Sequence, residues 1–293
     1  MDLALPAPNN VLLAAILLSL LAAAHLIAHK RNILYKNDTR NRLHVAWGIA
    51  LTGLPAVLYP KSLGLVFWAI IPMLAWQEWI TNVRIPHSTR TKAWWMGVAT
   101  YLVQLGCVLL LPPQHGWMAF FLPLLFAVAA WTKRPLSRWI STGMVATLLL
   151  PALALPLLMH ARLSVLIWCF VIPQMFDAFQ YIVGRKWGRH PLSRASPKKT
   201  WEGLLGGGLA AWLCAMSLSP WLPWNEWQTA YTTILLLAAS YLGGWLSSRL
   251  KRLLGLKDWG TRLGSHGGIL DRMDSLIFSI PIAWMFYYWH LHT

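Results

Sequence analysis

Two carboxylates in the second half of the sequence have the residue types and spacing to hold a metal ion that carries phosphate, and a third lies in an apolar stretch upstream of them. Asp271 and Asp274 lie three residues apart, so in the first turn of a helix they would share one face. Asp177 lies inside the apolar stretch VIPQMFDAFQYIVG, where an ionised side chain usually faces a cavity or a partner. Carboxylates beside many cations suit Mg²⁺. Helix capping by the first two acids, and pairing of Asp177 with Arg185, are the structural alternatives.

The segment that leads into Asp271 is dense in charge and in glycine. Between positions 248 and 275 it holds six Lys or Arg side chains and three of the nine acids of the chain. The tripeptide His266-Gly267-Gly268 can turn tightly and bring backbone N–H groups close to an anion. For His266 alone, a purely structural role is the alternative. The segment is therefore a candidate phosphate site.

A second basic segment, 184–202, follows Asp177 directly. Ser196 and the proline after it form a turn signal, and Lys198 and Lys199 come just before a new apolar run. Small residues and cations at the start of a helix favour phosphate binding, while contact with lipid phosphates alone is the alternative. Glu78 lies near the end of another apolar run. It is expected either to line the same cavity as Asp177 or to anchor its helix at a membrane interface.

The composition indicates a membrane protein. Hydrophobic residues make up 57% of the chain and charged residues 12%, about half of what a soluble domain carries. Separate apolar segments of about 20 residues can cross a bilayer only as helices. The sequence therefore predicts an all-α, polytopic integral membrane helical bundle of nine or ten transmembrane helices, with the first retained and not cleaved as a signal peptide. The predicted spans are 11–29, 44–60, 63–81, 93–111, 116–131, 139–158, 163–183, 203–220, 228–247 and 275–291.

The basic residues predict how this bundle lies in the membrane. Of the 25 Lys and Arg residues, all but Lys61 and Arg162 fall in alternate loops. The positive-inside rule then places both termini outside and the loops 184–202 and 248–274 in the cytoplasm. We therefore expect one membrane domain, 1–293, with an N-terminal helical bundle, 1–160, and a C-terminal catalytic half, 161–293.

The net charge of +16 does not indicate a nucleic-acid partner, because the basic residues form short clusters between apolar runs and no single basic face. The three cysteines each lie in an apolar run with no Cys or His at metal-ligand spacing. Neither disulfides nor a zinc site is expected.

Two stretches resemble the phosphatidate cytidylyltransferases, also called CDP-diacylglycerol synthases. The run SRLKRLLGLKDWGTRLGSHGGILDRMD, which begins at Ser248, is similar to the signature of that family. The run DAFQYIVGRKWGRH from Asp177, followed by SPKKTWEG from Ser196, is similar to its second conserved block. The resemblance covers about residues 165–290, and the N-terminal half is similar only as a bundle of several spans.

The resemblance implies a reaction and its participants. CTP and phosphatidate would give CDP-diacylglycerol and pyrophosphate in phospholipid biosynthesis, with Mg²⁺ as the cofactor. Whether a second cation takes part stays open. The enzyme would lie in a bacterial inner membrane with its active site facing the cytoplasm, and pairing into a homodimer stays open. The implied catalytic residues are Lys251, Asp258, His266, Asp271 and Asp274. The implied substrate-binding residues are Asp177, Ser196, Lys198, Lys199, Arg252, Gly267, Gly268 and Arg272. The implied metal ligands are Asp271, Asp274 and Asp177.

One position departs from the family pattern. Members generally carry Gly-Asp four residues before the signature serine, and that Asp resembles a metal ligand. Here the pair is Gly243-Gly244, so the carboxylate is missing. Two alternatives to the phosphatidate reaction follow: a divergent paralogue that uses another lipid phosphate, and a non-catalytic lipid-binding membrane partner.

Overall fold

The computed structural model describes residues 64–83, 85–110, 135–145, 147, 154, 157–158, 161–192, 199–263 and 267–292. Within these residues the chain is helical, and an isolated bridge between Pro191 and Thr200 is the one extended pairing they contain. The prediction of an all-α chain is confirmed for this part, while the predicted spans 11–29, 44–60 and 116–131 lie outside it. The elements are α3 (Leu65–Asn82), α4 (His87–Leu110), α6 (Pro135–Met144), α9 (Leu163–Trp187), α10 (Trp201–Ser217), η5 (Ser219–Trp221), α11 (Glu226–Leu253), α12 (Leu270–Met273) and α13 (Leu276–His292).

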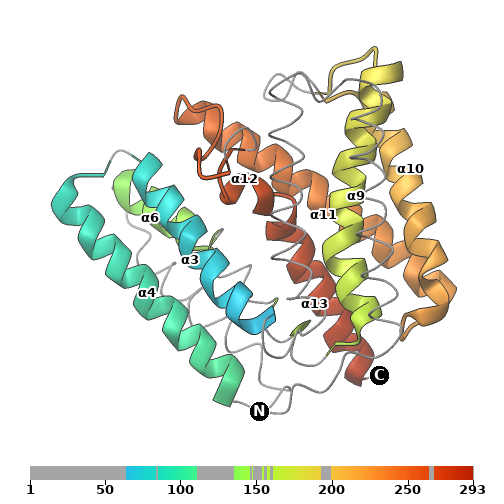
Figure 1. Cartoon of the computed structure of the whole chain (residues 1–293), viewed down its shortest axis with the longest axis horizontal. Helices are drawn as coiled ribbons and strands as arrows, with labels where there is room; N and C mark the ends of the chain where they lie inside the picture. Colours follow the sequence, from blue (N-terminus) through green and yellow to red (C-terminus); the bar gives the residue numbers. More distant parts are fainter. Residues whose placement is uncertain are drawn as a thin grey trace, which may run out of the picture.

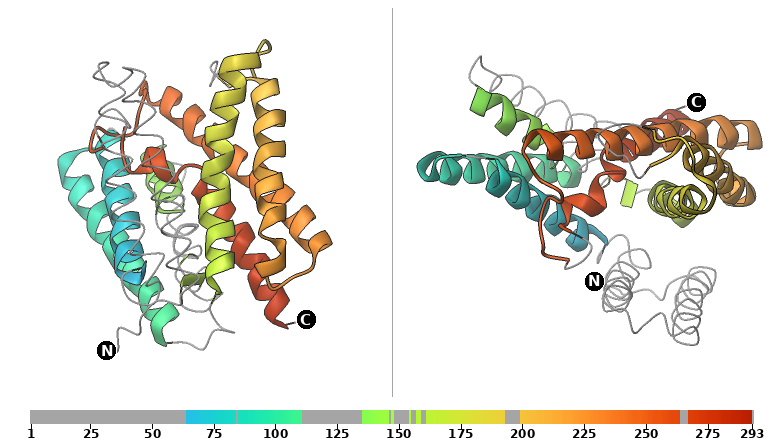
Figure 2. Two further views of the ribbon diagram at one scale, coloured as in Figure 1. Left: turned by 45° about the vertical axis from the view of Figure 1, so that its right-hand side comes forward. Right: turned by 90° about the horizontal axis from the view of Figure 1, so that it is seen from above.

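The helices form two groups joined by a central pair. Helices α3, α4 and α6 lie together on one side, α9 and α10 on the other, and α11 and α13 run between them (Figure 1). Figure 2 shows the same division from above. The C-terminal ends of α3, α9 and α11 lie at one end of the molecule, with α12 beside them (Figure 1). Segments distant in sequence are therefore brought together at that end.

Two predicted loops are partly helical. Helix α11 continues through SRLKRL to Leu253, and α9 continues to Trp187. Residues of these types form helices readily, so the helices extend beyond the apolar runs. Of the segment 248–274, the first six residues thus belong to α11 and 270–273 to α12. The charged side chains at these helix ends are held on regular backbone.

Small residues let α9 and α10 approach closely. Every fourth position of α10 that faces inward is small and buried; these are Gly203, Gly207, Ala211 and Ala215. A Cβ added at Gly207 would lie 2.5 Å from the backbone nitrogen of Gln180 and 2.7 Å from its Cα. Backbone atoms cannot move aside cheaply, so the contact depends on glycine. This is the small-residue packing that is common between membrane helices.

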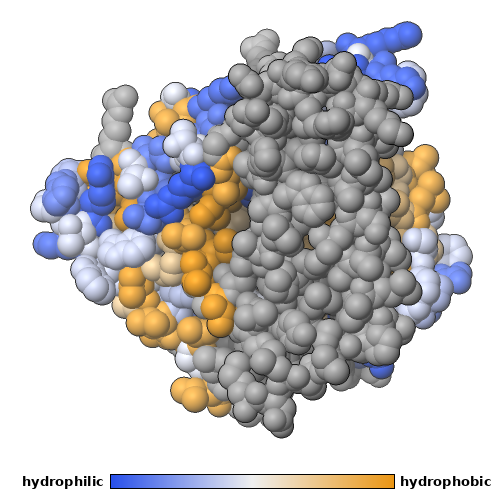
Figure 3. Space-filling model, viewed as in Figure 1, coloured by the Kyte–Doolittle hydropathy of each residue, from blue (hydrophilic) through white to orange (hydrophobic). Residues whose placement is uncertain are grey.

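The outer surface of these helices is apolar. Leu205, Leu209 and Leu213 form an exposed row at four-residue spacing on α10, and Val66 and Ile70 are exposed on α3. In the space-filling view, hydrophobic residues cover much of the visible flank beside the grey atoms (Figure 3). Among the described residues, two helices are long and apolar enough to cross a bilayer, Ser164–Trp187 and Glu226–Leu253.

The α9–α10 contact can be tested with two neighbouring glycines. We expect Gly207→Ala to destabilise the protein by about 1–3 kcal/mol, because the added methyl group overpacks backbone atoms. Gly208→Ala is the matched control, since a Cβ there would lie 3.7 Å from the Phe176 ring, an ordinary contact. Thermal unfolding of the purified protein in detergent measures both. Equal stability of the two variants would contradict the close approach.

Candidate active site

The carboxylate of Asp271 holds the end of α11 and the following loop together. Lys251 Nζ donates to its Oδ1 at 2.6 Å, and the side chains of Lys251 and Asp271 are only 11% and 6% exposed. The backbone N–H groups of Trp259 and Gly268 donate to Oδ2 at 2.7 and 2.8 Å. Hydrogen bonds to an ionised acceptor are short and strong, and here three of them converge. Lys251 and Asp271, which the family resemblance implies as catalytic residues, thus form an ion pair, while their catalytic roles stay predictions.

Glu78 anchors the same loop from α3. Its Oε1 accepts the N–H of Ile269 and its Oε2 accepts the N–H of Leu270, both at 3.0 Å, and Glu78 is 4% exposed. These are N–H groups at the start of α12, where no local side chain provides a cap. The prediction that Glu78 either lines a cavity with Asp177 or anchors its helix missed this role. A carboxylate inside an apolar run was the available signal, but its partners lie about 190 residues away.

The two glycines of the loop are required for different reasons. Gly267 has φ +80°, in the left-handed region, and a Cβ there would lie 2.6 Å from Asp271 Oδ2. A Cβ on Gly268 would overlap the Glu78 carboxylate and lie 2.8 Å from the backbone nitrogen of Gly260. The glycines therefore let the backbone close on two carboxylates. The anion that Gly268 N–H contacts here is the side chain of Asp271.

A second lysine–aspartate pair lies between α9 and the start of α10. Lys199 Nζ is 3.4 Å from Asp177 Oδ1, and both side chains are partly exposed. Lys199 also lies over the Tyr241 ring at 6.0 Å. A Cβ added at Gly244 would meet Lys199 Nζ at 3.5 Å and no other heavy atom within 4 Å, apart from its own helix backbone. The position where the family generally has Asp thus faces Lys199.

Asp274 interacts electrostatically with both pairs. Burial, together with the negative charges of Asp177 and Asp271, raises the pKa of its carboxyl to about 6, although Lys251 and Lys199 oppose this shift. Asp274 is the link between α12 and α13, and its Oδ1 accepts the N–H of Ser275 at 2.8 Å. Because it interacts with all four partners, the two pairs and Asp274 form one electrostatic cluster. We call these five residues the acid–lysine cluster.

The start of α10 fixes the position of Lys199. Thr200 accepts the N–H of Gly203 as an N-cap, and Glu202 accepts the N–H of Arg189 at 3.0 Å. Glu202 also contacts His190 Nδ1 at 2.5 Å. The backbone N–H of Arg189 and the ring of His190 lower the pKa of Glu202 to about 2. Lys199 therefore directly precedes a capped helix start, and Glu202 in the first turn of that helix also binds the segment at Arg189 and His190.

The carboxylates fit a metal ion in part. No three His, Cys, Asp or Glu side chains within the described ranges are close enough together to hold one. Both oxygens of Asp271 already accept protein donors. The charge of Asp177 repels that of the buried Asp274 and helps to raise the pKa of Asp274. Magnesium commonly takes one or two carboxylates and completes its shell with substrate phosphates and water. The Asp177–Asp274 pair fits that donor set.

Other predicted site residues lie at the edge of the cluster or outside the described residues. Arg252 donates to the carbonyl of Leu256 at 3.0 Å at the end of α11, and Asp258 and Arg272 are exposed. The substrate and catalytic roles implied for these three residues stay predictions. The predicted site residues Ser196, Lys198 and His266 lie outside the described residues.

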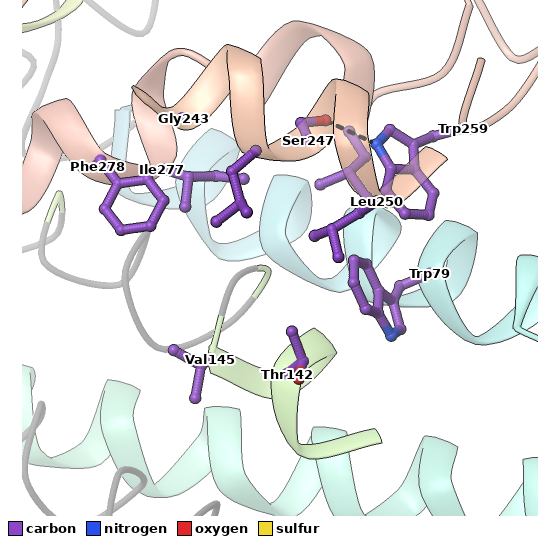
Figure 4. Close-up of a pocket in the computed structure, with 11 residues that line it drawn as sticks. Trp79, Thr142, Val145, Gly243, Ser247, Leu250, Trp259, Ile277 and Phe278 are labelled. Atoms are coloured by element: carbon purple, nitrogen blue, oxygen red, sulfur yellow. Dashed lines mark hydrogen bonds between the residues drawn. The ribbon is translucent and has the colours of Figure 1, made fainter. Parts of the chain in front are cut away.

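An apolar cavity lies directly below the loop. It has a volume of about 320 Å³ and lies between α11 and α13 on one side and α3 and α6 on the other. Figure 4 shows Trp79, Leu250 and Phe278 around it, with the Trp259 indole donating to Ser247 Oγ at 2.9 Å. Trp259 is buried and stacks on Trp79 with ring centroids 4.9 Å apart. The backbone N–H of Trp259 meets Asp271, so the cavity adjoins the acid–lysine cluster.

Comparison with known proteins identifies the family. The sequence model of the cytidylyltransferase family matches residues 40–290. The chain belongs to this family. It is accordingly an enzyme of the nucleotidyltransferase class. This membership favours a catalytic role over that of a non-catalytic lipid-binding membrane partner. The resemblance seen in the sequence motifs is confirmed.

The relatives differ in how much of the chain they cover. The uncharacterized protein YnbB of Escherichia coli is 29% identical over 262 residues, 84% of this chain and 86% of that protein. A phosphatidate cytidylyltransferase of Staphylococcus epidermidis is 39% identical over 123 residues, 41% of this chain and 47% of that protein. The chloroplastic phosphatidate cytidylyltransferase 4 of Arabidopsis thaliana is 39% identical over 114 residues, 38% of this chain and 29% of that protein. The match thus spans less than half the length of either phosphatidate cytidylyltransferase.

The role of Glu78 gives a direct prediction. Glu78→Gln replaces one accepting oxygen by an amide donor, so one buried N–H of Ile269 or Leu270 loses its partner, which costs about 1–3 kcal/mol. Hydrogen exchange of the amides in 267–271 should accelerate, and the unfolding temperature should fall. Glu226→Gln, an exposed acid at the start of α11, is the charge-matched control. Unchanged exchange in the Glu78 variant would show that this carboxylate does not hold the loop.

Proposed function

We propose that this enzyme transfers a cytidylyl group from CTP to phosphatidate in a membrane, giving CDP-diacylglycerol and pyrophosphate. The observation that carries the proposal is the acid–lysine cluster, in which Lys251–Asp271 and Lys199–Asp177 both interact electrostatically with Asp274. Membership in the cytidylyltransferase family supports CTP as the nucleotide substrate. The similarity to named phosphatidate cytidylyltransferases supports phosphatidate as the acceptor.

The reaction is a displacement at phosphorus. An oxygen of the acceptor phosphate attacks the α-phosphorus of CTP and forms the new P–O bond, while the bond from the α-phosphorus to the bridging oxygen breaks. That bridging oxygen leaves with pyrophosphate. Phosphoryl-type transfers of this kind need little covalent help from the protein, so alignment and charge stabilisation are its main contributions.

The chain's own residues supply both contributions. Lys251, held in one orientation by Asp271, stabilises negative charge on a phosphate at the loop. Lys199 does the same between α9 and α11, where the missing side chain of Gly244 leaves room beside its ammonium group. The Gly267–Gly268 backbone lets the loop pack closely over Asp271. Both lysines thus reduce the repulsion between two anionic substrates.

Magnesium is the cofactor we propose for this site. Asp177 and Asp274 are the pair that would hold it, since a cation between them would relieve their repulsion. Asp271 is implied as a ligand by the family resemblance, but its oxygens already accept Lys251 and two backbone donors. When bound, Mg²⁺ neutralises charge on the reacting phosphates.

The surroundings of the cluster support a lipid acceptor. The apolar cavity beside Trp259 is suited to an acyl chain, and exposed leucines on α10 are suited to contact with lipid. We place the enzyme in a bacterial inner membrane with this end facing the cytoplasm, as the distribution of Lys and Arg predicts. A polytopic bundle of nine or ten spans is part of the same proposal.

A second candidate is the same chemistry on a different lipid phosphate. The observation that favours it is Gly244, together with the similarity to YnbB over 84% of the chain. The two candidates share CTP and pyrophosphate and differ only in the acceptor. Parallel assays with phosphatidate and with a polyprenyl phosphate distinguish them.

The activity is tested with the purified full chain, phosphatidate, radiolabelled CTP and Mg²⁺. We expect labelled CDP-diacylglycerol, and Asp271→Asn should lower its rate of formation roughly 10–100-fold, because Lys251 loses the partner that orients it. Glu226→Gln serves as the control, and thermal unfolding verifies that each variant is folded. A wild-type protein that forms no more product than the Asp271 variant, with any lipid phosphate, would overturn the proposal.

Gly244 provides a test of the metal site. We expect Gly244→Asp to tighten Mg²⁺ binding several-fold, because the new carboxylate would join Asp177 and Asp274, and the space beside Lys199 accommodates it. Gly244→Asn has the same shape without the charge and should leave Mg²⁺ affinity unchanged. Calorimetric titration with Mg²⁺ measures both variants. Weaker binding in the Asp variant would mean that Lys199 neutralises the new charge instead.

A further inference from the structure

A polar cavity lies at the same loop and shares Trp259 with the apolar one. It has a volume of about 550 Å³ and lies between the C-terminal end of α3 and the turn 257–262. Its lining includes Thr81 and Asn82 of α3, Lys257, Asp258 and Arg262 of the turn, and Gly267. Volumes of 300–1,000 Å³ are typical of small-molecule sites, so the cavity is large enough for part of a nucleotide.

Two cations face this cavity with their charge still available. Lys257 is exposed and forms no hydrogen bond or ion pair with any residue that the structure describes. Arg262 donates from Nη2 to Gln77 Oε1 at 2.7 Å, and its Nε lies 3.9 Å from Glu78 Oε1. That second contact is weak, because Glu78 already accepts two backbone N–H groups. Both cations can therefore bind an incoming anion.

The cavity shares its wall with the acid–lysine cluster. Trp259 and Gly267 line it, and the N–H groups of Trp259 and of the neighbouring Gly268 donate to Asp271. Asn82 also donates to the carbonyl of Trp259, which ties α3 to the turn. Trp259 lines both cavities, so a polar and an apolar cavity meet at this residue.

We propose that the polar cavity binds the β- and γ-phosphates of the nucleotide, the part that leaves as pyrophosphate, through Lys257 and Arg262. The inference rests on the proposed function and gives the nucleotide a location. Phosphate oxygens are natural acceptors for an ammonium group and for a guanidinium with free N–H groups. Asp258 lies at the same rim, so it is available to interact with the Mg²⁺ that accompanies a triphosphate. A phosphate of a lipid headgroup has the same chemistry, but the apolar cavity beyond Trp259 is the better place for its chains.

The test compares nucleotides that differ only in these two phosphates. Binding of CTP, CMP and pyrophosphate to the full chain in detergent is measured by calorimetry with Mg²⁺ and without lipid. We expect Lys257→Gln and Arg262→Gln each to weaken CTP and pyrophosphate binding about tenfold or more, since each loses a charge-assisted contact. CMP binding should be unchanged. Arg249→Gln, an exposed cation over the Trp245 ring and outside the cavity, is the matched control.

The Lys257 variant carries the test if the Arg262 variant is unstable, because Lys257 makes no contact that folding requires among the described residues. Equal losses for CTP and CMP would overturn the inference, because the terminal phosphates would then not be the group bound. So would unchanged CTP binding together with weaker binding to phosphatidate vesicles, which would assign the cavity to the lipid. If wild type forms product but both variants bind CTP normally, this inference fails and the proposed function stands. If wild type neither binds CTP nor forms product, the proposed function itself fails.

Discussion

The arrangement of this end of the molecule depends on one buried ion pair. Taking the ammonium of Lys251 and the carboxylate of Asp271 out of water carries a large desolvation cost, which their mutual attraction offsets only when the remaining hydrogen-bonding capacity is also satisfied. Asp271 meets this condition by accepting two backbone N–H groups in addition to Lys251. The position of the charge and the path of the backbone are thus fixed together. Removing either charge would leave the other buried without its opposite charge.

The same constraint explains why α3 takes part in the site. The loop must turn sharply at Gly267 to reach Asp271, and this leaves the N–H groups of Ile269 and Leu270 in the interior. A buried N–H without an acceptor is costly, and the local sequence offers none. Glu78 provides two oxygens from a distant helix. The stacking of Trp79 on Trp259, one residue further along α3, adds apolar contact to the same junction.

The sequence predicts some of these features and not others, for physical reasons. Helix type and approximate limits follow from apolar runs, although α11 extends past its run because helix-forming residues continue to Leu253. The glycine pair and the acids around Asp271 are adjacent in sequence, so their local chemistry can be inferred. The hydrogen bonds of Glu78 and the position of Gly244 next to Lys199 depend on how separate helices pack. No local pattern contains that information, and the same holds for the two cavities that Trp259 lines.

The charge balance of the acid–lysine cluster bears on what else the reaction needs. Three carboxylates and two ammonium groups leave the cluster with a net charge of −1 when all are ionised. A lipid phosphate brings nearly two further negative charges near neutral pH, and a triphosphate brings more. The cluster alone therefore repels its proposed substrates, and additional positive charge is required at or near it. Because Gly244 carries no charge, the positive charge required is smaller by one elementary charge than in a chain with Asp at this position. Lys257, Arg262 and the proposed divalent cation can supply this positive charge near the Trp259 loop, so cations outside the cluster are essential to the proposed reaction.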